Sequence, residues 1–305
     1  MGHQVFSEEL VASVVKELQI ADLAHATIGE VLLVASRLEQ QTGIPFIRMD
    51  QGSPGLPANR VGVEAEKAAL DRGVGAQYPA ADGIPELKRE ASRFVKAFVD
   101  IDISPRACIP TTGSVAASFG AFVITTQCVS GKDKVLFIDP GFPIQKSQLR
   151  IIGAKWEQFD IYHYRGEALR EKLESYLKQG DIAAIVYSNP NNPAWICLED
   201  SELAIIGELS TRYGVIVLED MAYSVWTSVR TWANLGRRLI RLRWPAIRTI
   251  TFLCCLPPKS SAMPGSGWPW LVCPTNCSTR IIRRWPNVTA TPACSGRLSW
   301  LRCCI

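Results

Sequence analysis

The stretch IAAIVYSNPNNP occupies residues 182–193 and couples a hydrophobic run to a turn rich in asparagine and proline. Residues 182–187 are hydrophobic at every position, which is typical of a strand buried on both faces of a parallel sheet. The turn at residues 188–193 brings polar side chains directly beyond the strand, although turn formation alone explains most of its composition. Ligands of open α/β sheets bind at this position, so the stretch predicts both a sheet and a candidate site.

The same pattern of strand and polar turn occurs on both sides of this stretch. Residues 134–138 form a short β-rich run that is followed by Asp139-Pro140-Gly141-Phe142, and residues 215–219 form another that is followed by Asp220-Met221-Ala222-Tyr223. We therefore expect an α/β domain with three αβα layers around a mostly parallel sheet. The helices predicted between and beside these strands span residues 114–127, 142–152, 166–177 and 200–213.

The preceding part of the chain is predicted to be mainly helical. Hydrophobic residues such as Leu10, Val14 and Leu18 share one face between residues 8 and 41. Residues 46–57 form a loop rich in glycine and proline, and a further helix begins near Pro85, which suits a first turn. The apolar face of that helix comprises Leu87, Ala91, Phe94, Val95 and Phe98.

Polar residues at one helix start and beyond the strands form the candidate site. Thr111-Thr112-Gly113-Ser114 opens a predicted helix, where free backbone N–H groups and the helix dipole attract phosphate. Serine and threonine are also common helix caps, so this segment alone leaves both interpretations open. Phe142 is compatible with core packing or ring stacking, and Asp220 with a surface ion pair or a site carboxylate.

In chain order, these segments resemble the class I/II aminotransferases, which are pyridoxal-phosphate enzymes of fold type I. The resemblance covers about residues 44–223. It implies the large domain of that fold, incomplete at the C-terminus of this chain, with pyridoxal 5'-phosphate as the cofactor. It also implies an amino acid and a 2-oxo acid as substrates and, in the intact family form, a homodimer.

The resemblance assigns four positions around the cofactor's phosphate and ring. Tyr78, in the segment YPAADGIPEL, corresponds to a tyrosine that reaches the cofactor phosphate of the neighbouring subunit. Gly113 and Ser114 match the phosphate loop, and Phe142 matches an aromatic residue that stacks on the pyridine ring.

Four further positions surround the ring substituents and the substrate. Asn192 and Tyr223 match residues that bond the cofactor's phenolic oxygen, and Asp220 matches the aspartate that keeps the pyridine nitrogen protonated. Gly52, in the segment DQGSP, resembles a glycine near the substrate carboxylate. The family usually continues the NPNNP run with Thr-Gly, whereas this chain has Ala194-Trp195.

The resemblance also implies a lysine that holds the cofactor as a Schiff base, and no residue of this frame matches it. The family motif is Ser-x-x-Lys or Ser-x-Ser-Lys, followed by Gly-x-Arg. Lys259 lies 39 residues after Asp220, near the family spacing, but Pro257-Pro258 precedes it and Gly267 stands where the arginine is expected. The catalytic lysine is therefore unassigned, with Lys259 as a poor substitute.

The composition of the chain changes abruptly after Trp226. Residues 227–305 contain eleven Arg and one Lys but no Asp or Glu, and they hold seven of the ten Cys and six of the nine Trp. The first 226 residues carry 21 basic and 29 acidic residues, so the overall net charge of +4 describes neither part. This charge therefore indicates no electrostatic partner.

Three interpretations of this tail agree poorly with its composition. A disordered extension does not match its many Trp, Ile and Leu residues. A zinc module needs a second cysteine pair to match Cys273 and Cys277, but Cys254-Cys255 and Cys303-Cys304 are adjacent residues. No nucleic-acid-binding module frames the Arg and Trp residues, and the sequon at Asn287 has no accompanying sign of export.

A shifted reading frame explains the tail better. Codons can be chosen for the residues from Ser224 onward so that a neighbouring frame begins GVDFRTDLG. The same shift applied to residues 255–270 gives SASKVFSYAGQRMAL, which resembles the family's lysine motif. We therefore expect one nucleotide to be missing near codons 223–224, and Lys259 to be an accident of codon overlap.

These patterns divide the chain into a helical segment and arm (residues 1–60), a partial cofactor-binding large domain (61–226) and an out-of-frame tail without a native fold (227–305). The expected function is transamination by descent, inactive as written. A carbon–sulfur lyase on the same scaffold and a non-catalytic cofactor-binding or regulatory protein are the alternatives. The helical start is short for a DNA-binding module, and no stretch suits a signal peptide or bilayer span. We thus expect a cytoplasmic protein with no metal, nucleic-acid or membrane partner.

Overall fold

The computed structural model describes residues 6–48, 59–99, 102–222, 249–255 and 268–272. The chain divides into two compact units, Met1–Gly55 and Leu56–Ile305.

The first unit is a helical hairpin. Helix α1 (Glu8–Glu17) begins where the Ser7 side chain accepts a hydrogen bond from the Leu10 N–H. Helix α2 (Ile28–Thr42) begins with a capping box between Thr27 and Glu30, in which two otherwise free N–H groups are satisfied reciprocally. The small core of the hairpin contains Val14, Ile20, Val34 and Leu38. The predicted helical character of residues 8–41 is confirmed, with a break between the two helices.

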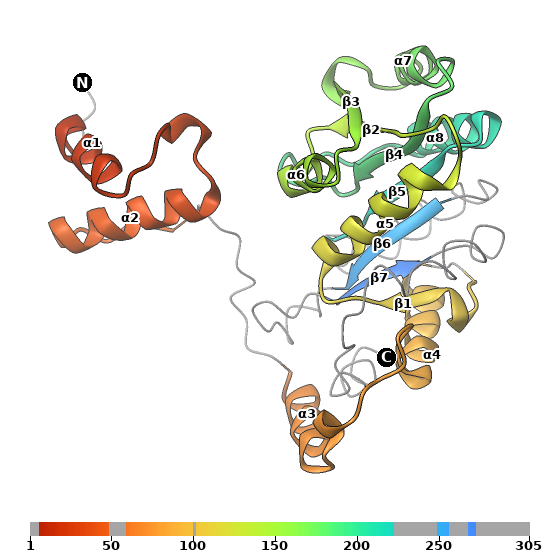
Figure 1. The fold of residues 1–305 in the computed structure, drawn as a ribbon, viewed down its shortest axis with the longest axis horizontal. Helices are drawn as coiled ribbons and strands as arrows, with labels where there is room; N and C mark the ends of the chain where they lie inside the picture. Colours follow the sequence, from red (N-terminus) through yellow and green to blue (C-terminus); the bar gives the residue numbers. More distant parts are fainter. Residues whose placement is uncertain (1–5, 49–58, 100–101, 223–248, 256–267, 273–305) are drawn as a thin grey trace. The chain divides into compact units, whose positions relative to one another are not determined.

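The second unit contains the sheet (Figure 1). Its described strands lie in the order β1-β7-β6-β5-β4-β2-β3, and β3, β2, β4, β5 and β6 are parallel to one another. Strand β7 is antiparallel to both β6 and β1. The strands are β1 (Cys108–Pro110), β2 (Lys134–Asp139), β3 (Lys155–Asp160), β4 (Ile182–Ser188), β5 (Ile216–Asp220), β6 (Thr249–Cys255) and β7 (Trp268–Val272). The longer helices are α3 (Arg60–Asp71), α4 (Pro85–Phe94), α5 (Ser114–Cys128), α6 (Pro143–Ile151), α7 (Ala168–Leu177) and α8 (Asp200–Tyr213).

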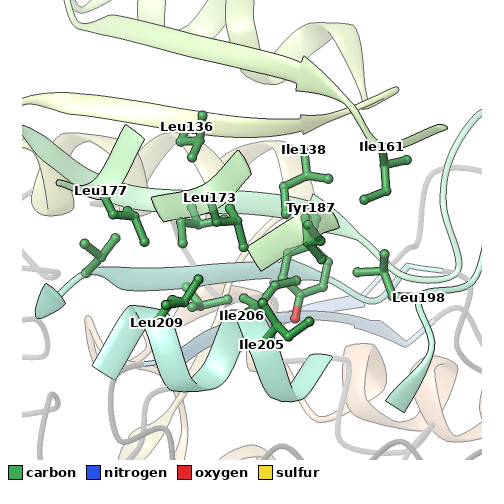
Figure 2. Packing of buried hydrophobic residues seen from close by; sticks show 14 of the residues in the cluster. Leu136, Ile138, Ile161, Leu173, Leu177, Tyr187, Leu198, Ile205, Ile206 and Leu209 are labelled. Atoms are coloured by element: carbon green, nitrogen blue, oxygen red, sulfur yellow. The ribbon is translucent and has the colours of Figure 1, made fainter. Parts of the chain in front are cut away.

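Alternate side chains of the central strands enter two separate cores, one on each face of the sheet. On one face, Val135, Ala184 and Leu218 pack with residues of α5 and α6. On the other face, Leu136, Ile185 and Val217 pack with α7 and α8; Figure 2 shows Leu173, Leu177, Ile206 and Leu209 in this layer. The chain therefore has the predicted three-layer αβα fold, and the predicted strands at residues 134–138, 182–187 and 215–219 are β2, β4 and β5.

The structure contains elements that the sequence did not predict. Strands β1 and β3 and helix α3 are among them. Strands β6 and β7 lie within residues 227–305, the segment expected to lack a native fold; the rest of that segment lies outside the described residues. In the part of the chain that the structure describes, no helix has both the length and the apolar character needed to cross a membrane.

Candidate active site

Several predicted site residues lie at the edge of the sheet formed by the carboxyl ends of three parallel strands. Ser188, the last residue of β4, is in register with Asp220, the last residue of β5. Strand β2, on the other side of β4, ends at Asp139. The turns beyond β2 and β4 carry Phe142 and Asn192.

Asp220 is a buried carboxylate at this edge, with 6% of its surface exposed. Its Oδ1 accepts a hydrogen bond from the Ala222 N–H at 3.1 Å, and its Oδ2 accepts one from Gln145 Nε2 at 3.3 Å. Burial raises the pKa of Asp220 from 3.8 to about 6, and the Ala222 N–H acts in the opposite direction. Among the described residues, no basic side chain pairs with Asp220, so a cationic ligand group at this carboxylate would restore its charge balance.

The NPNNP turn is held in shape by Asn191, which the sequence analysis did not single out. Its Nδ2 donates to the Pro140 carbonyl at 2.6 Å and to Ser188 Oγ at 3.1 Å, and its Oδ1 accepts from the Ala194 N–H at 3.0 Å. These bonds join the turns that follow β2 and β4. The neighbouring Asn192 donates its backbone N–H to Ser188 Oγ and is half-buried, so the turn fixes the position of this predicted ligand residue.

The start of helix α5 has the features of a phosphate site. Gly113 is the N-cap residue and has a φ of +115°, a value that favours glycine. No side chain caps the helix among the described residues, which leaves its first N–H groups to a ligand or to water. Thr111 Oγ1 donates to the Gly113 carbonyl at 3.1 Å, and Ser114, the first helical residue, is half-buried. The predicted helix start is confirmed, and neither serine nor threonine acts as its N-cap.

Phe142 precedes helix α6 and is its N-cap residue, half-buried beyond the end of β2. Lys146 on the same helix forms an ion pair with Asp139, the last residue of β2. The turn between β2 and α6 thus places an aromatic ring at the same sheet edge as Asp220.

Tyr78 lies in a segment that is tied to β1 but leaves this side chain fully exposed. The segment is held at Gly83, whose φ is +97° and where an added Cβ would lie 2.6 Å from the Pro110 ring. Lys88 fixes the same segment by donating to the Asp82 carbonyl at 3.1 Å and to its carboxylate at 2.6 Å. No hydrogen bond joins Tyr78 to the other predicted site residues in the described part of the chain. Gly52, Tyr223 and Lys259 lie outside the described residues.

The residues at this edge fit pyridoxal phosphate. The buried Asp220 has no cationic partner among the described residues, which suits a protonated ring nitrogen. The uncapped start of α5 suits a phosphate, because its dipole and N–H groups favour an anion. Phe142 offers a ring face and Asn192 an amide at the same edge.

Comparisons with known proteins identify the family of the chain. The family profile described as aminotransferase class I and II matches residues 45–239. The chain therefore belongs to the class I/II aminotransferase family. It is 27% identical over 203 residues to an aspartate aminotransferase from Pyrococcus horikoshii, an alignment that covers 66% of this chain and 49% of that protein. The chain spans about half the length of the curated relatives it matches.

Two other matches bear on activity and fold. An S-alkyl-thiohydroximate lyase from Arabidopsis thaliana is 22% identical over 200 residues, covering 64% of this chain and 42% of that protein. The solved aspartate aminotransferase of Thermotoga maritima superposes with a TM-score of 0.74 at 19% identity, covering 95% of this chain and 73% of that one. The second match supports the fold.

Proposed function

We propose that this chain carries the cofactor-binding half of a pyridoxal-phosphate-dependent aminotransferase, one that moves an amino group between an amino acid and a 2-oxo acid. The observation that carries the proposal is Asp220, a buried carboxylate at the end of β5 whose described neighbours include no cation. The start of α5, Phe142 and Asn192 supply the remaining contacts. Family membership and the aminotransferase relatives support the same activity.

Each residue has a role that its chemistry suits. The α5 N-terminus, with Gly113 and Ser114, holds the phosphate, and Asp220 holds the proton on the ring nitrogen. Phe142 orients the ring, while Asn192 and Tyr223 bond the phenolic oxygen. When bound, the cofactor supplies an electron-accepting ring that stabilises negative charge at the substrate Cα. The family resemblance assigns Gly52, which lies outside the described residues, to the substrate carboxylate.

The proposed active form is a homodimer. Tyr78 is fully exposed, on a segment that Gly83 and Lys88 fix to its own subunit. An exposed tyrosine on a fixed segment suits a hydroxyl that serves the phosphate of a second copy. Analytical ultracentrifugation of the frame-restored chain tests this point, since a monomer that binds the cofactor with full affinity would contradict it.

We further propose that the chain as written lacks the reactive lysine because its reading frame changes after Tyr223. The loss of acidic residues after Trp226 and the poor context of Lys259 support this proposal. Resequencing the gene around codons 223–224 is the direct test. A confirmed sequence whose alternative frame carries stop codons before the SASK-like motif would overturn it.

A carbon–sulfur lyase is the second candidate, favoured by the S-alkyl-thiohydroximate lyase among the relatives. Both reactions use the same cofactor contacts, so the residues at this sheet edge fit either one. The frame-restored chain separates them when it is given an amino acid with and without a 2-oxo acid acceptor. Aminotransferase activity requires the acceptor, whereas a lyase releases a thiol from a suitable thioether substrate without it.

A further inference from the structure

Two buried glutamines share one side of helix α6 and reach opposite ends of the proposed cofactor site. Gln145 and Gln148 are three residues apart, which places them on one face of the helix. Their exposed fractions are 4% and 5%. A buried amide costs free energy unless it is hydrogen-bonded, so the partners of these side chains indicate why the helix carries them.

Gln145 contacts the carboxylate of Asp220. Its Nε2 donates to Oδ2, while the Ala222 N–H donates to Oδ1, so each carboxylate oxygen has a described donor. Two donors on different oxygens fix the rotation of the carboxyl group. Donation to a carboxylate also favours its ionised form, the form that can hold a proton on a ring nitrogen.

Gln148 contacts the first turn of α5. Its Nε2 donates to the Val115 carbonyl at 2.6 Å, and its Oε1 accepts from Ser118 Oγ at 2.8 Å. Val115 directly follows Ser114, the first residue of α5. Gln148 therefore fixes the helix start that presents N–H groups to a phosphate.

The elements around Asp220 bring little charge to this arrangement. Helix α5 and strands β4 and β6 contain no charged residue. Helix α6 carries Lys146 and the exposed Arg150, and strand β2 carries Lys134 and Asp139. Lys146 pairs with Asp139 and Lys134 with Asp181, and Glu219 precedes Asp220 on the alternate face of β5. The described polar contacts of this carboxylate are therefore two neutral donors, the Ala222 N–H and the Gln145 amide.

We propose that α6 is the positioning element of the cofactor site: Gln145 positions the Asp220 carboxylate and Gln148 positions the phosphate-binding start of α5. Because one helix makes both contacts, the two ends of the site keep a fixed spacing. Phe142, the N-cap residue of α6, belongs to the same element. This inference rests on the proposed function for the identity of the ligand, but the contacts themselves do not.

The test uses the full 305-residue chain and pyridoxine 5'-phosphate, which has no aldehyde and so cannot react with any lysine. Q145L and Q148L each remove one buried amide of the same helix and serve as matched controls for one another. The readouts are the carbon-13 titration of the Asp220 carboxyl group, assigned with D220N, and the affinities for pyridoxine 5'-phosphate and for inorganic phosphate.

We expect a different response from each variant. Q145L raises the titration midpoint of Asp220 by about 1 pH unit and weakens pyridoxine 5'-phosphate binding about tenfold at pH 7, with phosphate affinity unchanged. Q148L weakens phosphate binding about tenfold and leaves the Asp220 midpoint in place. If Q145L does not fold, Q145E keeps the side-chain shape, and its second carboxyl group also raises the midpoint.

Equal effects of Q145L and Q148L on the Asp220 midpoint would overturn the inference, as would a midpoint that neither Q145L nor Q145E moves. Failure of the proposed function looks different. In that case the unmodified chain does not bind pyridoxine 5'-phosphate saturably, yet the Asp220 midpoint still responds to Q145L.

Discussion

Asp220 is a carboxylate held where its own charge costs free energy. The pKa of Asp220 in the folded chain is about 6, above the ordinary aspartate value of 3.8. The folded chain therefore keeps the carboxyl proton of Asp220 at pH values where the unfolded chain has lost it. The free energy of unfolding therefore falls as the pH rises from about 4 to about 6, and it stays lower above that range. The full effect is on the order of 3 kcal/mol.

The substitution D220N removes this pH dependence. At pH 7 the ligand-free variant should melt at a higher temperature than the unmodified chain, because a neutral amide replaces an uncompensated charge. At pH 4 the two should melt alike, since Asp220 is then protonated, and this comparison is the internal control. A variant less stable at pH 7 would mean that Asp220 has a cationic partner in the ligand-free protein. Binding of pyridoxine 5'-phosphate should weaken at pH 7, where Asp220 is ionised in the unmodified chain.

At the residue scale, the sequence predicted the site residues that follow strands, but not the side chains that hydrogen-bond to these residues and their turns. Asp220 and the turn that contains Asn192 follow strand-like runs, so strand position marked these segments, and the family resemblance assigned the two residues. The bond of Gln145 to Asp220 spans 75 residues, and that of Asn191 to Pro140 spans 51. Glutamine and asparagine side chains have no periodic signature, so such partners emerge only when the strands are placed side by side.

The segment that carries Tyr78 depends on one glycine for its attachment to β1. Alanine at Gly83 combines an unfavourable φ of +97° with a Cβ placed 2.6 Å from the Pro110 ring. We expect G83A to lower the free energy of unfolding by about 2 kcal/mol, measured by urea titration. G75A, in the short helix Val74–Ala76 just before this segment, meets no atom within 4 Å and is the control, with a change below about 0.5 kcal/mol. Equal effects of the two substitutions would contradict this account.

Helix α8 is anchored by a buried carboxylate at its first turn. Glu202 is 1% exposed and accepts from Arg165 Nε at 2.6 Å, from Arg165 Nη2 at 2.8 Å and from the Gly166 N–H at 2.9 Å. Its truncation leaves the guanidinium and backbone donors without their acceptor.

We expect E202A to cost about 3 kcal/mol in unfolding free energy. E208A is its counterpart on the same helix, because Glu208 pairs with Arg170 and Arg212 at the surface. That substitution should cost less than about 1 kcal/mol, since exposed ion pairs contribute little. Thermal unfolding of both variants at one pH gives the comparison. Similar losses of unfolding free energy would show that burial of Glu202 does not make its contacts more stabilising than those of Glu208.

The elements that the sequence predicted are those buried on both faces. Strands β2, β4 and β5 are mainly hydrophobic because helices cover both sides of the sheet there. Strand β3 is an outermost strand of the sheet. Its sequence is KWEQFD, and only Phe159 is buried, so its hydrophobic pattern does not differ from that of a surface segment. Strand β1 has three residues, too few for any period to show.

At the scale of the whole molecule, the proposed cofactor-binding residues of the described chain lie up to the end of β5, whereas the lysine needed for catalysis would lie after it. The described part of the large domain has its layers, its cores and the residues proposed to contact the cofactor, namely Asp220, Asn192 and the start of α5. Transamination needs in addition a lysine that bonds the cofactor and moves the Cα proton, and the written chain offers only Lys259 after Asp220. We therefore expect this protein to bind the cofactor non-covalently without catalysing transamination.

The frame-restored chain is the decisive comparison. We expect the chain as written to bind the cofactor weakly, to show no aminotransferase turnover, and to form no borohydride-reducible bond between the cofactor and one specific lysine. The chain with one nucleotide restored near codon 223 should show both turnover and the reducible bond. Peptide mapping of the reduced product identifies the lysine, and it should fall in the SASK-like motif.

The prediction would be contradicted if Lys259 formed the covalent bond with the cofactor in the chain as written. Pro257 and Pro258 restrict the backbone before it, and a catalytic amine must be held within about 0.5 Å of its working position. Such placement by an accidental lysine is not expected. Stoichiometric trapping of the cofactor on Lys259 in the chain as written, abolished by K259A but not by K146A, would show that the written frame makes its own active site. Lys146 is a useful control because it belongs to the same sheet edge and is already paired with Asp139.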